Sequence, residues 1–199
     1  MFTRGRPPDA RLAGILAEVH GADLTYPEVG ATRRPGALPA GYHHARASAL
    51  LGEGDAVFAA AVAGVRGWRL HRGQGFRVVP AEPPVEPGTE VVVDAPLPLG
   101  VHVIAACRVV WTVDEADRFG FGYGTLPVHP AAGEEAFVVE RLASGAVQIT
   151  VTAFSRPRHP LVRLGGPIAR WQQRQATRGY VTALQAFVAG EISSGPSSG

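Results

Sequence analysis

Three polar residues in the middle of the chain, Tyr123, His129 and Glu135, have the chemistry that acid–base catalysis or polar ligand recognition needs. A tyrosine hydroxyl can orient a ligand by donating a hydrogen bond, and a glutamate with a raised pKa near a histidine can move protons at neutral pH. They are therefore our candidates for catalytic residues, in an enzyme of cyclase, hydrolase or isomerase type.

Glu134 and Glu135 stand at the start of a run in which apolar residues alternate with others. Because neighbouring side chains of a strand point to opposite faces, the spacing of Glu135 and Phe137 predicts that Glu135 points inward and Glu134 outward. A carboxylate in an apolar interior must find a partner or keep its proton, and His129 and Arg156 are possible partners. The alternative interpretation is structural: Glu135 belongs to a pair that ties a loop to a strand.

Residues 119–124 alternate aromatic residues with Gly120, Gly122 and Gly124. In a strand this pattern places the aromatic side chains on one face and the glycines on the other. One interpretation is a strongly bent strand whose aromatic residues fill the core; the other is that Tyr123 lines a ligand cavity. The glycines do not form a phosphate-binding loop, because no helix is predicted directly after them.

Residue patterns for metal binding or nucleophilic catalysis are missing from the sequence. His43 and His44 are adjacent and so face opposite sides of a strand, and the remaining histidines lack the spacing of metal ligands. There is no Gly-x-Ser-x-Gly motif, and Cys107, the single cysteine, excludes an intramolecular disulfide. We therefore expect no metal and no cofactor, and a location in the reducing cytoplasm.

All 19 basic residues are arginine, yet the formal net charge of the 199-residue chain is only +2. This excess is too small to indicate nucleic-acid binding. The apolar runs are shorter than the ~18 residues of a membrane-spanning helix, so no membrane span is expected. Arg170, Arg174 and Arg178 repeat every fourth residue, which predicts a solvated helix face or, together with Arg33 and Arg34, a surface that docks a macromolecule.

The elements that would position these residues follow from two hydrophobic periods. A short helix after Pro7 ends at Gly21, and an arm rich in Pro, Gly and Arg continues to Gly41. The remaining pattern predicts strands over 43–51, 76–79, 89–93, 101–113, 118–126, 136–142 and 147–154, and helices over 56–65 and 160–189. In the run 101–113 alternation predicts a packed face and a wet face. The packed face holds Val101, Val103, Cys107, Val109, Trp111 and Val113, and the wet face holds His102, Arg108 and Thr112.

This order of elements predicts an α+β fold, in which a curved antiparallel sheet of about seven strands surrounds a long C-terminal helix. A sheet that curls around a helix leaves more space than side chains fill, so we expect a largely apolar cavity. Residues 1–42, the N-terminal helix and arm, are expected to pack on a domain of residues 43–190. Residues 194–199 are typical of a cloning tag and are excluded from the fold prediction.

Several stretches of the sequence resemble a known family: residues 24–32, the turn at 51–54 with Phe58, Trp68, residues 121–126, His129 and Pro130, residues 133–137, and residues 154–157. They are similar to the uncharacterised family of domain of unknown function 1990 (DUF1990, UPF0548). The order of elements resembles the helix-grip (SRPBCC) superfamily of START domains, polyketide cyclases and birch-pollen-allergen-like proteins. The resemblance covers residues 9–188 and implies this fold, with no established activity.

Three functions remain open from the sequence. The first is binding of a small hydrophobic molecule in the cavity, with ligand contacts expected from Tyr123, His129, Glu135, Phe137, Trp111, His43 and Arg156. The second is the enzyme described above, which requires Glu135 or His129 to meet Tyr123 in one cleft. The third is docking of a macromolecule on the arginine-rich surface. The identity of the ligand and the oligomeric state do not follow from the sequence.

Overall fold

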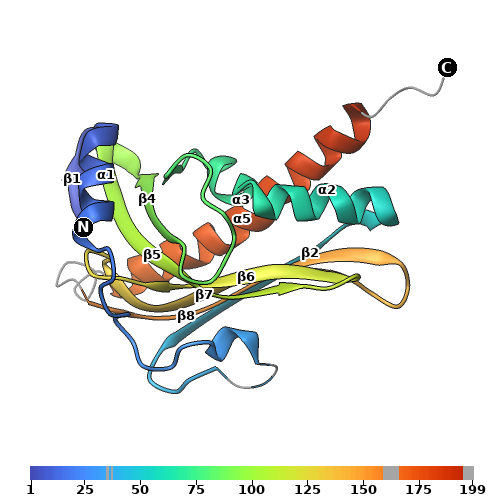
Figure 1. Ribbon diagram of the computed structural model, residues 1–199, viewed down its shortest axis with the longest axis horizontal. Coiled ribbons are helices and arrows are strands. Elements are labelled where there is room, and N and C mark those ends of the chain that lie inside the picture. The colour runs from blue at the N-terminus through green and yellow to red at the C-terminus, as the bar shows by residue number, and fades with distance from the viewer. Residues whose placement is uncertain (35, 37, 159–165, 195–199) are drawn as a thin grey trace.

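The computed structural model describes residues 1–34, 36, 38–158 and 166–194, with side chains described outside residues 166–176. It confirms the predicted α+β fold, an antiparallel sheet with a long C-terminal helix lying across it (Figure 1). The elements, in chain order, are β1 (Phe2–Arg4), α1 (Asp9–Glu18), the 3-10 helix η1 (Ala31–Arg33), β2 (His43–Glu53), α2 (Asp55–Arg66), α3 (Arg69–Arg72), β3 (Arg77–Val79), β4 (Glu90–Pro96), the 3-10 helix η2 (Pro98–Gly100), β5 (Val101–Asp114), β6 (Arg118–Thr125), β7 (Ala131–Arg141), β8 (Ala146–Pro157) and α5 (Gly166–Ser194).

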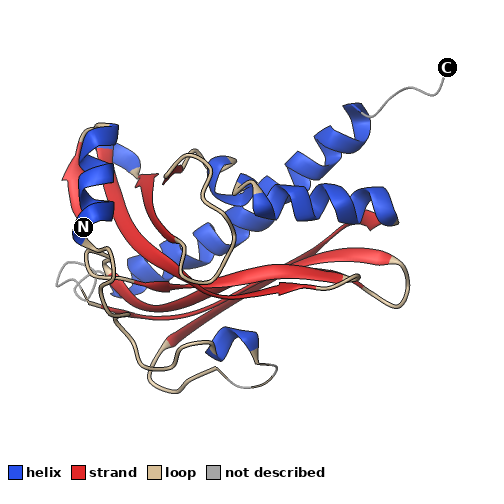
Figure 2. Cartoon of the chain, in the orientation of Figure 1, coloured by secondary structure: helices blue, strands red, loops and turns tan. Residues whose placement is uncertain are grey.

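The sheet has eight strands in the order β2-β8-β7-β6-β5-β4-β3, and β1 pairs with β5 beside this path. All of these pairs are antiparallel. About seven strands were predicted; β1, with three residues, is too short to show an alternating pattern. Figure 2 shows the long strands as one curved layer with α2, α3 and α5 on one side of it.

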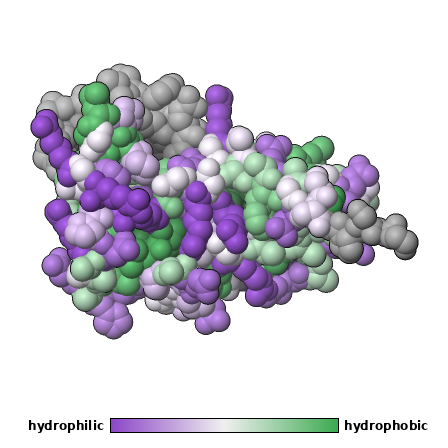
Figure 3. All heavy atoms as spheres, turned by 90° about the horizontal axis from the view of Figure 1, so that it is seen from above, coloured by the Kyte–Doolittle hydropathy of each residue, from purple (hydrophilic) through white to green (hydrophobic). Residues whose placement is uncertain are grey.

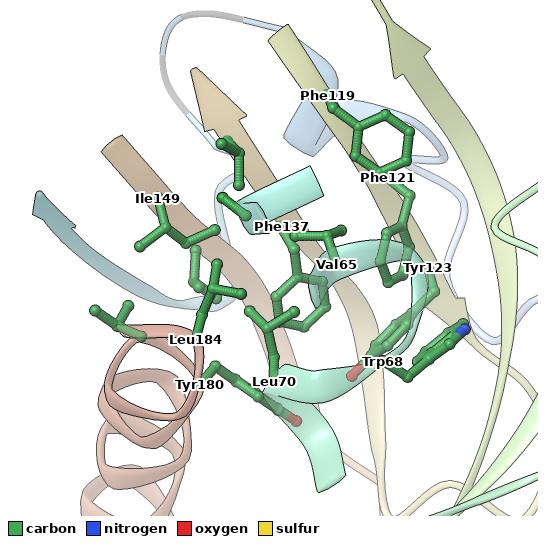
Figure 4. Close-up of a cluster of buried hydrophobic side chains, with 14 of the residues drawn as sticks. Val65, Trp68, Leu70, Phe119, Phe121, Tyr123, Phe137, Ile149, Tyr180 and Leu184 are labelled. Atoms are coloured by element: carbon green, nitrogen blue, oxygen red, sulfur yellow. The ribbon is translucent and has the colours of Figure 1, made fainter. Parts of the chain in front are cut away.

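The face of the sheet that contacts α2, α3 and α5, here called the inner face, holds the main core. It packs Phe121 and Phe137 from neighbouring strands against Trp68 and Leu184 (Figure 4). Helix α5 buries Tyr180, Val181, Leu184 and Val188, the spacing of one face of an α-helix. The two hydrophobic periods in the sequence therefore meet on this face, as predicted.

Residues before β2 cover the opposite, outer face of the sheet. Helix α1 packs Leu12 and Ile15 onto Val92 of β4 and Ile104 of β5. Between α1 and β2 the chain crosses the outer face of β6–β8 as an arm with η1 in it (Figure 1). Both faces of the middle of the sheet are consequently buried, whereas one wet face was predicted.

A β-bulge in β5 overturns the predicted facing of Trp111. Val109 pairs with Tyr123, but the next register pair is Trp111 with Gly122, so one extra residue lies between them. A bulge of this kind moves every later side chain to the other face. Trp111 and Val113 therefore lie on the outer face, and their prediction on the same face as Cys107 was wrong.

The alternation of glycine and aromatic residues in β6 has a more specific cause than a bent strand. The aromatic side chains lie on the inner face, as predicted. On the outer face, a Cβ atom at Gly122 would lie 2.3 Å from Nε1 of Trp111, and one at Gly124 would lie 2.2 Å from the hydroxyl of Tyr26. Gly122 and Gly124 thus leave room for large side chains that come from β5 and from the arm.

Candidate functional site

Four polar residues lie together among apolar side chains of the inner face, and we call His71, Tyr123, Glu135 and Tyr180 the polar set. Tyr123 on β6 and Glu135 on β7 are directly opposite each other in the register, and so point to the same face. His71 comes from α3, and Tyr180 comes from α5 on the far side of the core. Elements that are far apart in sequence thus supply a single group.

Hydrogen bonds link three members of this set in a row. The Tyr123 hydroxyl donates to Oε2 of Glu135 over 2.9 Å, and Nε2 of His71 lies 3.2 Å from the same hydroxyl oxygen. When Tyr123 donates to the carboxylate, its oxygen can accept from a neutral His71 protonated at Nε2. Nδ1 of His71 is then an acceptor; it is buried, and no described residue bonds to it.

Aromatic rings enclose the histidine. The His71 ring centroid lies 4.8 Å from that of Tyr180, 5.0 Å from Trp68, 5.2 Å from Phe137 and 5.7 Å from Tyr123. Figure 4 shows Tyr123, Phe137 and Tyr180 around the end of the cluster where Trp68 and Leu70 approach the sheet. Rings at these spacings fill the space around the imidazole, and water is kept from most of the polar set.

Burial decides the charge of each group. It raises the pKa of Glu135 from 4.5 to about 7, an effect that the hydrogen bond from Tyr123 partly offsets. Burial, helped by the nearby Arg72 charge, lowers the pKa of His71 from 6.5 to about 3. The pKa values of Tyr123 and Tyr180 rise well above 10 because both hydroxyls are buried next to the Glu135 carboxylate. At neutral pH Glu135 is the one member that exchanges a proton readily.

Glu135 differs from the rest of the set in its contact with solvent. His71, Tyr123 and Tyr180 are buried, but Glu135 is partly exposed although it lies on the face that α5 crosses. On the neighbouring strand β8, Glu135 is paired with Ala153, and Ala153 is paired with Ala45 of β2. The neighbours of Glu135 on the β8 and β2 side of the inner face are therefore small.

The sequence correctly placed Glu135, Tyr123 and Phe137 on one face, but the remaining predicted ligand contacts lie elsewhere. His129 bonds through Nδ1 to the backbone of Ala131 and is not part of the polar set. Arg156, expected beside Glu135, lies on the outer face with its guanidinium 5.0 Å from the Tyr42 ring. Trp111 is also on the outer face, and His43 is exposed at the start of β2, on the same face of that strand as Ala45 and Ala47.

Two members of the polar set, His71 and Tyr180, were not singled out from the sequence. Trp68 and His71 are three residues apart, a spacing typical of one helix face. This spacing was the one feature of the sequence that could have indicated that His71 lies beside Trp68 in the core. Tyr180 was assigned to the apolar stripe of the C-terminal helix, where it does lie. Only the packing of that helix shows that its ring also meets the histidine.

Glu134 has a separate, structural role on the outer face. Its carboxylate accepts hydrogen bonds from Tyr26 Oη (2.7 Å), the backbone N–H groups of Gly30 (2.7 Å) and Thr32 (2.9 Å), the Thr32 hydroxyl, and Trp111 Nε1 (3.3 Å). Five donor groups stabilise a buried carboxylate without a cation. The outward direction of Glu134 was predicted, but its burial beneath the arm was not.

A second buried carboxylate, Asp94, ties the N-terminal segment to the sheet edge. It accepts hydrogen bonds from Nε and Nη2 of Arg77 at 2.9 and 2.7 Å, and its other oxygen lies 2.7 Å from Nδ1 of His102. Arg77 also bonds to Asp9 at the start of α1. This cluster is saturated with partners from the chain itself, so we assign it to stability.

A cleft of about 580 Å³ opens where α2 and α3 meet the ends of β5 and β6. Arg66, Arg69 and Arg72 line it, together with Glu82, Pro83, Pro84, Val85, Glu86, Thr112, Asp114, Phe119, Gly67 and Trp68. On the helix side of the molecule, seen from above in Figure 3, hydrophilic residues separate the hydrophobic patches. The cleft is open and of mixed polarity, unlike the enclosed apolar cavity that we predicted.

Other site types find little support in the described part of the chain. Within it no three His, Cys, Asp or Glu side chains are grouped so that they could hold a metal ion. None of its helices is long and apolar enough to cross a membrane. Arg33, Arg34 and Arg178 are exposed, but the side chains of Arg170 and Arg174 lie outside the described residues.

Comparison with known proteins identifies relatives in sequence and in fold. The family model described as Domain of unknown function (DUF1990) matches residues 25–183. A UPF0548 protein of Deinococcus radiodurans is 34% identical over 196 residues, covering 92% of this chain and 97% of the relative. A START superfamily protein of Mycobacterium smegmatis has a TM-score of 0.52 at 9% identity, covering 75% of this chain and 99% of that chain. The structure of Ara h 8.0201 has a TM-score of 0.50 at 18% identity, with coverage of 75% and 99%. The two structures share the START-like fold with this chain.

Proposed function

This chain belongs to the DUF1990 family, and we propose that it binds a small hydrophobic molecule between the inner face of the sheet and α5, with Glu135 and Tyr123 as polar anchors. The observation behind the proposal is the position of Glu135, a partly exposed carboxyl group that lies among core side chains and accepts a hydrogen bond from Tyr123; burial raises its pKa to about 7. A charge on this face is costly without a partner, so a ligand with a complementary polar group would stabilise it.

The surroundings of Glu135 suit an apolar ligand with one polar end. Aromatic side chains of the core lie on one side of Glu135, and the small side chains of Ala45 and Ala153 lie on the other. Binding sites for small molecules are typically apolar, with a few polar groups that set the orientation. The START-like fold places α5 over this face and is consistent with the proposal.

Native mass spectrometry of the protein purified from its own cells would test the proposal. We expect a co-purifying small molecule on the wild-type chain, and lower occupancy on Glu135→Gln. The matched control is Glu140→Gln, an exposed carboxylate on the same strand but on the other face, which should keep the wild-type occupancy. An experimental structure in which side chains fill all the space beside Glu135 would contradict the proposal.

A second candidate function, general acid–base catalysis, is favoured by the same pKa of about 7 and by the hydrogen bond from Tyr123 to Glu135. Glu135 would act as the base, without His129. If the identified ligand has an acidic C–H bond, the wild-type protein should speed its exchange with deuterated water, and Glu135→Gln should abolish this exchange. Unchanged exchange in the variant would exclude Glu135 as the base.

A further inference from the structure

The described groups around Glu135 leave it as the single source of charge on this part of the inner face. Tyr123 bonds to it from β6, Cys107 on β5 and Tyr180 on α5 lie near it, and His71 on α3 lies behind Tyr123, bonded to its hydroxyl. Burial keeps all four neutral at physiological pH, because it lowers the pKa of His71 to about 3 and raises the pKa values of the thiol and the two phenols. These described groups leave the region neutral or negative.

Two arginines on neighbouring elements, Arg72 and Arg156, have partners away from Glu135. Arg72, next to His71, points away and donates to the backbone carbonyl of Ala81. Arg156 lies on the outer face, against Tyr42. Within the described side chains, Glu135 therefore has a hydrogen-bond donor in Tyr123 and no cationic partner.

We infer that the hydrophobic molecule presents a protonated amine to the Glu135 carboxylate. This inference rests on the proposed function and specifies the chemical class of its ligand. A carboxylate in apolar surroundings attracts a cation much more strongly than it would in water, and the ion pair adds a charge-assisted hydrogen bond. The aromatic rings of Phe137 and Tyr180 beside it are also favourable surroundings for a cation. A fatty acid or a phosphorylated ligand would instead bring a like charge to Glu135.

Three probes with the same naphthalene body and different head groups would test the inference: naphthylmethylamine, naphthylmethanol and naphthoate. Isothermal titration calorimetry at about pH 8 keeps the amine protonated and Glu135 ionised. The amine should bind the wild-type protein roughly tenfold or more tightly than the alcohol, and naphthoate should bind most weakly. In Glu135→Gln the amine should fall to the affinity of the alcohol, whereas Glu140→Gln should keep the wild-type order.

Proton release gives a second measurement that does not need the variant. A cation lowers the pKa of Glu135 from about 7, so binding of the amine near neutral pH should release protons. Titrations in buffers of different ionisation enthalpy would measure this release, which the alcohol should not cause.

The possible outcomes separate the two proposals. If naphthoate binds most tightly, or if Glu135→Gln leaves the ratio of amine to alcohol affinity unchanged, the amine inference is wrong while the binding site stands. If none of the three probes binds, the proposed function itself is contradicted. Glu135→Gln is isosteric and removes a buried charge, so we expect it to fold, and circular dichroism checks this.

Discussion

Replacing Glu135 by glutamine should change how the stability of the protein depends on pH. The pKa of Glu135 is about 7 in the folded protein and has an ordinary value of 4.5 in the unfolded chain. The folded state therefore binds more protons between these values, and stability falls as the pH rises through this window. At ~1.36 kcal/mol per pKa unit the full penalty is roughly 3 kcal/mol, and the partial exposure of the side chain reduces it to about 2.

This penalty is absent below about pH 4.5 and complete above about pH 7, and a glutamine at position 135 does not have it. We therefore expect Glu135→Gln to gain about 2 kcal/mol relative to wild type between acidic and mildly alkaline pH, or roughly 4–8 °C in Tm. Because the pKa of His71 is about 3 in the folded protein, protonation of His71 lowers the stability of the protein as the pH falls below 6.5. This loss is the same in the wild type and in Glu135→Gln. Its effect cancels in the difference.

Urea unfolding of the wild type, Glu135→Gln and Glu140→Gln across this pH range would measure the effect. The curve for Glu140→Gln should run parallel to the wild type, because that carboxylate is exposed on the other face. Should Glu135→Gln also run parallel, the reasoning would be refuted: Glu135 would then have a counter-charge or full access to water.

Three further substitutions test the parts of the structure that hold the site. Gly124→Ala should lower the free energy of unfolding by ~1–3 kcal/mol in thermal denaturation, because its Cβ would overlap the Tyr26 hydroxyl. Gly190→Ala is the control and should not lower the free energy of unfolding, because the space around Gly190 is open. Glu134→Ala leaves five donor groups without their acceptor and should therefore loosen the arm over residues 22–42. Limited proteolysis of the arm should become faster, and an unchanged rate of cleavage would argue against the contact between Glu134 and the arm. Asp94→Ala should cost ~3–5 kcal/mol in urea unfolding by leaving a guanidinium partly buried without its partner, and a loss below ~1 kcal/mol would contradict the structural role.

The adjacent residues Glu134 and Glu135 mark where sequence reasoning succeeded and where it stopped. Strand alternation correctly predicted that they face opposite sides, because the direction of neighbouring side chains is a property of the strand itself. It could not show that the outward carboxylate is buried by an arm contributed by residues 22–42. For Trp111, one extra residue in β5 reversed the predicted face, since a bulge shows no mark in a periodic pattern.

Local sequence determined the elements of this protein and the fold class that follows from them. Apolar residues repeat with a period of two through the middle of the chain and near 3.6 at its end, and backbone geometry turns each period into one buried face. Tertiary structure alone decided which residues share a site. Strand register set Tyr123 opposite Glu135, and the placement of α3 and α5 added His71 and Tyr180 to them. Contacts of this kind join residues that are distant in sequence, and they depend on how whole faces pack, which a local pattern does not record.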